Sequence, residues 1–295
     1  MIVCFGSINL DLIFPLPALP QRGQTVLGRA MRVEPGGKGA NQAVAAARDG
    51  ATVLFAGAVG RDALAAQALA TLRAAGVDLS RVAEADSSTG CAAICVDPAG
   101  NNHIAVAAGA NLLARAEQVE DRLLHRGTTV LLQAETDLEA TAALIRRAHA
   151  GGARVVLNLA PAARLPDDAL RAVDVLVMNE DEGGWLGNAL GTGGDAAGIR
   201  GALGNAVVIT MGGRGLQAAT PQGHIELAAH TVTVVDTTAA GDCFTGVLAA
   251  GLDRGLAMPA ALRRANVAAG ICCSRAGSQG SLPTASETDS GITAL

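Results

Sequence analysis

Short runs of apolar residues alternate along the chain with longer segments that are rich in alanine and leucine. The runs have the length and the valine and isoleucine content of strands buried on both faces, and the longer segments have the length of helices. This alternation predicts an α/β fold with a mostly parallel central sheet flanked by helices. The predicted strands are Ile2–Phe5, Thr52–Gly57, Thr129–Gln133, Arg154–Asn158, Val173–Met178 and Ala206–Thr210, and the predicted helices are Lys38–Arg48, Ala63–Ala75, Arg115–Arg126, Leu138–Ala150, Asp195–Leu203, Asp242–Arg254 and Met258–Ala276.

Two regions interrupt this alternation. Residues 10–33 place several prolines and glycines among short apolar pieces, and residues 90–109 contain two strand-like runs, Cys91–Val96 and His103–Ala107, around the turn Asp97–Gly100. Both regions predict antiparallel ribbons, and we expect them to form a small sheet at one edge of the main body, as a lid over a ligand cleft. No linker or repeat divides the chain, so residues 1–295 predict a single domain with a discontinuous β lid.

Three other segments have weaker patterns. The glycine-rich stretch Gly183–Gly194 predicts a flexible surface loop, and Thr231–Val235 predicts a strand. The end of the chain, Thr284–Leu295, lacks an amphipathic pattern, so we expect it to be loosely ordered.

Composition and charge narrow the functional classes. Of the 295 residues, 50% are hydrophobic and 17% are charged, which is enough for a sizeable core. The formal net charge of −5, with no tyrosine, one tryptophan and four phenylalanines, argues against nucleic-acid binding. No segment has the pattern of a membrane span or an export signal, and the six cysteines include no C-x-x-C pair. We therefore expect a cytoplasmic protein with reduced thiols.

The segment Asp236–Asp242 has the pattern of an anion-binding turn. It follows the strand-like Thr231–Val235, and its small residues at 239–241 let the backbone approach a ligand closely at the start of an apolar helix. Asp242 would accept a proton from an attacking hydroxyl while helix N–H groups stabilise the charge on a phosphate. The alternative is that Asp242 is only an N-cap and the alanines only pack.

A second glycine-rich turn, Pro35–Gln42, leads into a helix. Gly39 stands where a Walker motif needs serine or threonine, and Gln42 ends the pattern before a dinucleotide fingerprint is complete. The turn instead presents N–H groups, the Lys38 cation and the Asn41 amide together, a combination that suits a polyhydroxy ligand. A purely structural turn is the alternative.

Polar side chains also follow several predicted strands. Asn9 and Asp11 leave the first strand two residues apart, Glu135 follows the strand that ends at Gln133, and Asn179 with Glu182 follows the strand that ends at Met178. Because the carboxyl ends of parallel strands meet at one edge of a sheet, we expect these groups to converge on one cleft.

Together these motifs resemble the ribokinase-like carbohydrate kinases, a family that also includes kinases of the minor phosphofructokinase type. The similarity runs from Gly6 to about Pro283 and is strongest at the glycine-lysine turn and the aspartate segment. The matched segments are Gly6–Asp11, Gly36–Arg48, Ser88–Gly90, Gly109–Asn111, Asn158–Ala162, Asn179–Glu182 and Val235–Asp242.

The resemblance implies a three-layer ribokinase-like fold and ATP-dependent transfer of the γ-phosphoryl group to a sugar hydroxymethyl oxygen, with O5 of D-ribose as the favoured acceptor. By matched position, Asp242 is the implied catalytic base, and Ala239, Ala240 and Gly241 form the implied anion hole. The residues implied to bind the sugar are Asn9, Asp11, Gly37, Lys38, Asn41, Glu135 and Asp242. Those implied to bind the nucleotide are Asn179, Thr210, Gly212, Gly241 and Asn266, and Glu182 would organise Mg²⁺ through water.

The resemblance also implies a potassium site beside the anion hole. It maps to Asp236, Thr238, Cys272, Arg275, Gly277 and Ser281, several of them through main-chain carbonyls. The ion would fix the loop that presents the N–H groups. The ribbon at residues 90–109 corresponds to the family's lid, which also pairs two subunits, so a homodimer is expected.

Other functions remain as alternatives. A kinase of the same family for another sugar or a nucleoside is one, although Phe14 is the only aromatic residue near the ligand segments and base stacking usually needs more. A non-catalytic sugar-binding or regulatory protein is another, and the presence of Asp242 argues against it. Leu159 replaces the proline of the family's N-P-A-P motif, and Cys243 and Thr245 replace residues of its aspartate motif. These differences touch no implied catalytic group but leave the sugar open.

Overall fold

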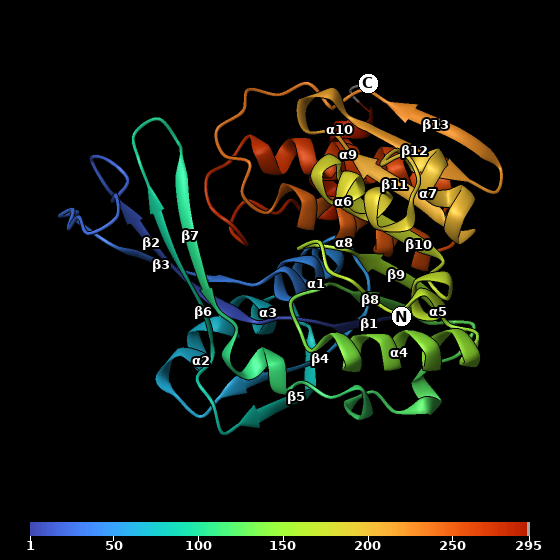
Figure 1. Ribbon diagram of the computed structural model, residues 1–295, viewed down its shortest axis with the longest axis horizontal. Helices are drawn as coiled ribbons and strands as arrows, with labels where there is room; N and C mark the ends of the chain where they lie inside the picture. Colours follow the sequence, from blue (N-terminus) through green and yellow to red (C-terminus); the bar gives the residue numbers. More distant parts are fainter. Residues whose placement is uncertain (294–295) are drawn as a thin grey trace.

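The computed structural model describes residues 1–293 and contains a nine-stranded central sheet (Figure 1). In spatial order its strands are β13 (Gly223–Leu227), β12 (Leu216–Thr220), β11 (Ala206–Thr210), β10 (Val175–Asn179), β9 (Arg154–Asn158), β8 (Thr129–Leu132), β1 (Ile2–Phe5), β4 (Val53–Gly60) and β5 (Asp78–Ala85). Neighbouring strands from β11 to β5 are parallel, and β12 and β13 add an antiparallel hairpin at one end. The predicted, mostly parallel sheet is therefore confirmed.

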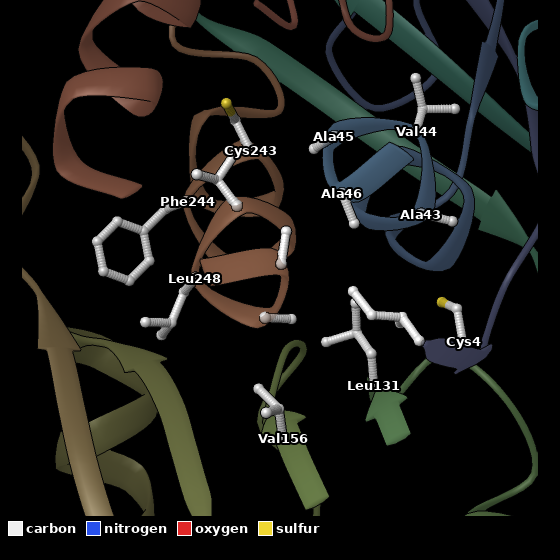
Figure 2. Close-up of a cluster of buried hydrophobic side chains, with 14 of the residues drawn as sticks. Cys4, Ala43, Val44, Ala45, Ala46, Leu131, Val156, Cys243, Phe244 and Leu248 are labelled. Atoms are coloured by element: carbon white, nitrogen blue, oxygen red, sulfur yellow. The ribbon is translucent and has the colours of Figure 1, made fainter. Parts of the chain in front are cut away.

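Helices cover both faces of this sheet and make three layers. On one face lie α1 (Lys38–Arg48), α2 (Ala63–Ala68), α3 (Ala70–Ala74), α8 (Ala240–Asp253) and α9 (Met258–Cys273), and on the other lie α4 (Leu138–Gly151), α5 (Asp167–Arg171), α6 (Glu180–Leu190) and α7 (Ala196–Leu203). Successive residues of a strand enter opposite cores: Cys4 packs with the first group of helices and Phe5 with the second. Figure 2 shows α1 and α8 packed over Leu131 and Val156 of the sheet.

The interrupted regions form a separate four-stranded sheet, as predicted. Its order is β3 (Arg32–Gly36), β2 (Asn9–Pro15), β6 (Gly90–Val96) and β7 (Asn102–Ala107). The pairs β2–β3 and β6–β7 are antiparallel ribbons, and a parallel pairing of β2 with β6 joins them. This small sheet projects to one side of the three-layer body (Figure 1). Its edge strand β7 is exposed along its whole length.

The predicted helix over Arg115–Arg126 is wrong. The segment forms two 3₁₀ turns, η2 (Ala116–Gln118) and η3 (Asp121–Leu123), separated by extended backbone at Val119 and Glu120. The Arg147 guanidinium of α4 donates to the carbonyl oxygens of Ala116 and Val119, each at 2.8 Å. These tertiary bonds take acceptors that a continuous helix would have used. A third 3₁₀ turn, η1 (Gly109–Leu113), precedes the segment, and η4 (Gly212–Arg214) follows β11.

The prediction of a flexible loop over Gly183–Gly194 is also wrong, because most of it lies in α6. Asn179 and Glu182 form a reciprocal capping box that starts this helix. Its glycines permit close packing: a Cβ atom on Gly187 would lie 2.6 Å from the Cα atom of Gly194. The glycines are therefore explained by contact between segments rather than by flexibility.

Two further expectations fail near the end of the chain. Residues 231–235 form no strand, and residues 285–293 form the helix α10 (Ala285–Thr293). Polar contacts dock α10, since Arg275 pairs with Glu287 at 2.6 Å and Arg264 pairs with Asp289. A weak apolar pattern therefore does not prevent order here. The last part of the Thr284–Leu295 prediction, residues 294–295, lies outside the described residues.

No helix within residues 1–293 has both the length and the apolar character needed to cross a membrane.

Candidate active site

A cavity of about 230 Å³ lies where the predicted polar groups converge. It is bounded by the carboxyl ends of central strands, the start of α1 and the start of α8. Its lining includes Lys38, Asn158, Asn179, Glu182, Thr210, Thr237, Ala239, Ala240, Gly241 and Asp242. Residues that are some 200 positions apart in sequence therefore line one polar site.

The start of α8 has the geometry of an anion hole. Ala239, which precedes the helix, has φ 59° and is the only residue other than glycine with a positive φ in the described chain. Ala240 donates its N–H to the Thr237 carbonyl at 3.2 Å, whereas no backbone acceptor meets the N–H groups of Gly241 and Asp242 within residues 1–293. Strained backbone of this kind is concentrated at functional sites, and the free N–H groups suit an anion.

Asp242 is not the N-cap of this helix. That position belongs to Ala239, and the Asp242 carboxylate instead accepts two side-chain hydrogen bonds. Asn41 Nδ2 donates to Oδ2 at 2.9 Å, and Gln42 Nε2 donates to Oδ1 at 3.0 Å. Asp242 is 8% exposed, lines the cavity and lies in the same helical turn as the free N–H groups. The capping alternative from the sequence is therefore wrong.

Lys38 opens α1 directly after a turn that requires glycine. Gly37 has φ 89°, and a Cβ atom there would lie 2.8 Å from the backbone nitrogen of Asn9. Burial lowers the pKa of Lys38, but the carboxylates of Asp242 and of two glutamates, Glu135 and Glu182, outweigh burial and raise it. Lys38 is therefore a cation among acids.

The predicted sugar-binding groups surround this turn. Glu135 Oε2 accepts from the Ser7 hydroxyl at 2.6 Å and from the Lys38 N–H at 3.1 Å. Asn9 Oδ1 accepts from Asn111 Nδ2 at 2.8 Å. The side-chain oxygen Oδ1 of Asn41 already accepts from Gln279 at 3.0 Å and from Ser278 at 3.3 Å. Its side-chain nitrogen Nδ2 is therefore the atom that faces Asp242. These bonds fix the rim of the cleft before any ligand arrives.

Asp11 is the exception in this group. Burial, followed by the charges of Glu135, Glu34 and Asp242, raises its pKa to about 7. Within residues 1–293 no hydrogen bond stabilises its carboxylate, so this acid lies among like charges with acceptor capacity to spare.

Asn179 and Glu182 face the cavity from the start of α6. Each side chain accepts the other's backbone N–H at 2.8 Å, which fixes both. Burial raises the pKa of Glu182, although the bond from Asn179 and the charge of Lys38 oppose this. Among the described residues, no group of three or more His, Cys, Asp and Glu could hold a metal ion. A divalent ion here would therefore depend on Glu182, water and a ligand's own oxygens.

A second cavity of about 380 Å³ adjoins the first and shares Thr210, Thr237 and Gly241 with it. It brings together the predicted nucleotide contacts Thr210, Gly212 and Asn266. Most of the remaining lining is apolar or glycine, including Leu216, Val232, Val234 and Phe244. The polar cavity thus adjoins an apolar one. This arrangement suits a nucleotide, whose phosphates need polar partners and whose flat base needs apolar ones.

The residues of the predicted cation site meet behind the anion hole. Asp236 Oδ1 accepts from the Thr238 N–H at 2.9 Å, and Oδ2 accepts from the Gly277 N–H at 3.0 Å. Burial alone would raise the pKa of Asp236, but these bonds outweigh it and lower the pKa. Cys272 Sγ lies 3.1 Å from the Ser281 hydroxyl. The Arg275 guanidinium, in contrast, pairs with Glu287 on α10.

Sequence reasoning missed a set of buried amides beneath the site. Gln42 and Asn158 contact Asp242 or each other, and Asn111 holds Asn9. All three lie within the matched motifs, so the signal was present. Their roles could not be assigned, because the bonds join positions more than 100 residues apart.

Comparison with known proteins agrees with this geometry. Residues 1–285 match the pfkB family carbohydrate kinase. The chain belongs to the pfkB family of carbohydrate kinases. The family's fold and its ATP-dependent kinase chemistry, both expected from the sequence motifs, are thereby confirmed for this chain.

Several relatives extend over the whole chain. It is similar to a ribokinase from Haemophilus influenzae, with 33% identity over 296 residues that cover 96% of this chain and 95% of the relative. A structure of Arabidopsis thaliana ribokinase complexed with ribose and ATP is 28% identical, with a TM-score of 0.88, covering 99% of this chain and 98% of that one. The chain spans about half (54%) of a bifunctional ribokinase/ribose-5-phosphate isomerase A from Fructilactobacillus sanfranciscensis, with 34% identity over 298 residues and 96% of this chain covered.

Proposed function

We propose that this pfkB family kinase phosphorylates D-ribose at O5 with ATP, giving D-ribose 5-phosphate and ADP. The observation that carries the proposal is the Asp242 carboxylate beside the free N–H groups of α8, facing the polar turn at Lys38. The family match and the ribokinase relatives over nearly the full chain support the choice of ribose.

In this mechanism Asp242 accepts the proton of the O5 hydroxyl as O5 attacks the γ-phosphorus. The O5–P bond forms, the bond from phosphorus to the bridging oxygen breaks, and ADP leaves with that electron pair. The N–H groups of Gly241 and Asp242 stabilise charge on the transferred phosphoryl group, with Ala239 and Ala240 shaping the loop. The Lys38 cation lies on the sugar side of the same cavity.

The two ends of the site would bind the two substrates. Asn9, Asp11, Gly37, Lys38, Asn41 and Glu135 are the proposed sugar-binding residues, and Thr210, Gly212, Asn266, Asn179 and Gly241 the proposed nucleotide-binding residues. The carboxylates and amides of the first set suit sugar hydroxyls. The apolar second cavity suits an adenine ring.

Two ions complete the proposal. The oxygen donors at Glu182 and Asn179 fit Mg²⁺ held through water, and the ion supplies neutralisation of the phosphate charge when bound. The carboxylate, hydroxyl and carbonyl oxygens at Asp236, Thr238, Cys272, Arg275, Gly277 and Ser281 fit a monovalent cation, K⁺. Replacing Na⁺ by K⁺ is expected to raise both kcat and the melting temperature, and no change in either would contradict this site.

We further propose a cytoplasmic homodimer that pairs through the small sheet. Strand β7 is an exposed edge strand, and its Ile104 and Val106 are each 55% exposed. Light scattering on the wild type and on Val106→Glu tests the dimer, which is expected to dissociate in the variant.

The substrate proposal is tested with an acceptor panel of ribose, deoxyribose, fructose, 2-keto-3-deoxygluconate and nucleosides, with ADP release as the readout. Ribose is expected to give the highest kcat/KM. Turnover of another acceptor without ribose turnover would retain the kinase and overturn the sugar. Sugar binding without turnover of any acceptor would favour a non-catalytic binding protein.

A further inference from the structure

Gln42 lies directly beneath the proposed base and is completely buried. Its Nε2 donates to Asp242 Oδ1 at 3.0 Å and to Asn158 Oδ1 at 2.9 Å. Its Oε1 accepts from Gln133 Nε2 at 2.7 Å. Both hydrogen-bonding atoms of this side chain are thus used, and two of its partners, Asp242 and Asn158, line the cavity, whereas Gln42 is not among the residues that line it.

The orientation of this amide is fixed from a backbone atom. The Val177 carbonyl of β10 can only accept, so Asn158 must present Nδ2 to it, at 3.1 Å, and Oδ1 to Gln42. Gln42 must then direct its NH₂ group toward Asn158 and Asp242, and Gln133 must donate to the remaining oxygen. The NH₂ group of Gln42 therefore faces Asp242 Oδ1 because a chain of hydrogen bonds, beginning at the Val177 carbonyl in the sheet, fixes its orientation.

This network attaches the base to the sheet as well as to its own helix. Helices α1 and α8 touch at this level: a Cβ atom on Gly246 of α8 would lie 2.3 Å from the Gln42 backbone oxygen. Asn41 donates a hydrogen bond to Oδ2 of Asp242 and Gln42 donates one to Oδ1, so both carboxylate oxygens are fixed. A carboxylate rotates easily about its last torsion, and with one donor removed it would do so.

We propose that Gln42 is a positioning residue for the phosphoryl-transfer reaction, which holds the Asp242 carboxylate in its working orientation through the Asn158 and Gln133 amides. The inference rests on the proposed function, since it assumes that Asp242 is the base. Gln42 is completely buried and lines neither cavity, so we expect its loss to affect the chemical step and not substrate binding.

The test is Gln42→Met, which keeps the length and volume of the side chain but removes its donors. The expected result is a kcat lower by about 10- to 100-fold, because small misplacements of a catalytic group have effects of this size. KM for ribose, and ribose affinity measured by calorimetry, are expected to stay within about threefold of wild type. A kcat within twofold of wild type, or a loss of ribose affinity equal to the loss in kcat, would overturn the proposal.

A second variant, Gln42→Glu, gives a readout that a merely structural role would not move. Its new carboxyl group donates to Asp242 only while protonated, so the ratio of its kcat to that of wild type is expected to fall as pH rises from 6 to 9. A constant ratio would contradict positioning by a donor. This variant also preserves the test if Gln42→Met does not fold, because it keeps the shape and an acceptor for Gln133.

The matched control is Asn205→Leu, which removes another buried amide. Asn205 donates to the backbone carbonyl oxygens of Leu170 and Val173, far from the site. It is expected to lower the melting temperature without changing kcat. Wild type measured beside the variants separates failure of the proposed function from failure of the proposed role of Gln42. If wild type turns over no acceptor, the proposed function fails, whereas a wild type that is active on any acceptor allows Gln42 to be judged on it.

Discussion

The two carboxylates that face the proposed sugar, Asp242 and Asp11, have opposite surroundings. Asp242 accepts amide hydrogen bonds at both oxygens, at 2.9 and 3.0 Å, and lies beside a helix start. Asp11 has no such partner, and burial among acids raises its pKa to about 7. The proposed base is thus held by the protein in advance, whereas the proposed sugar-binding acid lacks the donors that sugar hydroxyls would supply.

The difference follows from the elements that carry the two residues. Asp242 lies on α8, packed against α1 and connected to the sheet through buried amides. Asp11 lies on β2 of the small sheet, opposite Glu34 of β3 in the strand register. Like charges opposite one another destabilise a strand pair. Repulsion between like charges therefore destabilises the proposed binding end, which agrees with a site that needs its substrate to complete it.

The strongest test of this contrast is Asp242→Asn. The variant keeps the shape of the side chain but has no carboxylate to accept a proton, so kcat is expected to fall by about 10³-fold. Ribose binding, measured by calorimetry, is expected to remain. The control is Asp253→Asn at the far end of the same helix, where the carboxylate pairs with the amino terminus. Near wild-type turnover by Asp242→Asn would show that another group is the base.

Asp11→Asn tests the binding end. Removing a charged acceptor from a hydroxyl is expected to raise KM for ribose by about 10- to 100-fold, with a much smaller change in kcat, because a hydrogen bond to a charged group contributes about 1.5–3 kcal/mol. Steady-state kinetics with varied ribose measure both values. Glu84→Gln, on an exposed acid that is 4.0 Å from Arg61, serves as the control for loss of one charge. A fall in kcat alone would remove the distinction between the two ends.

The raised pKa of Asp11 also predicts a dependence on pH. The ionised acid is the better acceptor, so ribose affinity is expected to fall by about tenfold as pH decreases from 8 to 6, below the pKa of about 7. Calorimetry at several pH values measures this, and Asp11→Asn is expected to remove the dependence. An affinity of wild type that is flat over this range would show that Asp11 stays ionised.

The raised pKa of Asp11 also makes the stability of the folded chain depend on pH. The pKa of Asp11 is higher in the folded chain than in the unfolded chain, so the stability that its protonated form contributes is complete near pH 4 and lost as pH rises through about 7. Asp11→Asn is therefore expected to be more stable than wild type at pH 8, by about 1–3 kcal/mol, and nearly equal to it at pH 4. Urea denaturation at both values provides the comparison, and a less stable variant at pH 8 would contradict it.

The sequence predicted the catalytic end better than the binding end. Continuous apolar runs such as Val155–Leu157 indicate buried strands, and small residues before an apolar helix indicate the proposed anion hole. The edge strands β5 and β13 were missed, because their exposed polar residues leave no apolar run. The surroundings of Asp11 were also missed, since its neighbours Glu34 and Glu135 reach it through strand pairing and loop packing.

The errors in the predicted fold have a common physical origin. At α6 and α10, capping bonds and ion pairs outweigh poor helix formers: Asn179 and Glu182 start one helix, and Thr284 and Glu287 start the other. At residues 115–126 the opposite occurs, since Arg147 from α4 takes the backbone acceptors. In each case specific polar contacts outweighed local propensity: caps between residues three apart start α6 and α10, and a guanidinium from α4 prevents a continuous helix at residues 115–126.

The smallest expected effect concerns strain at the catalytic end. Ala239 has φ 59°, a region that costs a residue with a Cβ atom about 1–2 kcal/mol and costs glycine little. Ala239→Gly is therefore expected to raise the melting temperature by about 2 °C, while Ala240→Gly, in the first helical turn where alanine is unstrained, lowers it. Because glycine also loosens the loop beneath the free N–H groups, kcat of Ala239→Gly is expected to fall by less than about threefold. If Ala239→Gly melts below wild type, the strain is absent, and the catalytic end owes its rigidity to the buried amides alone.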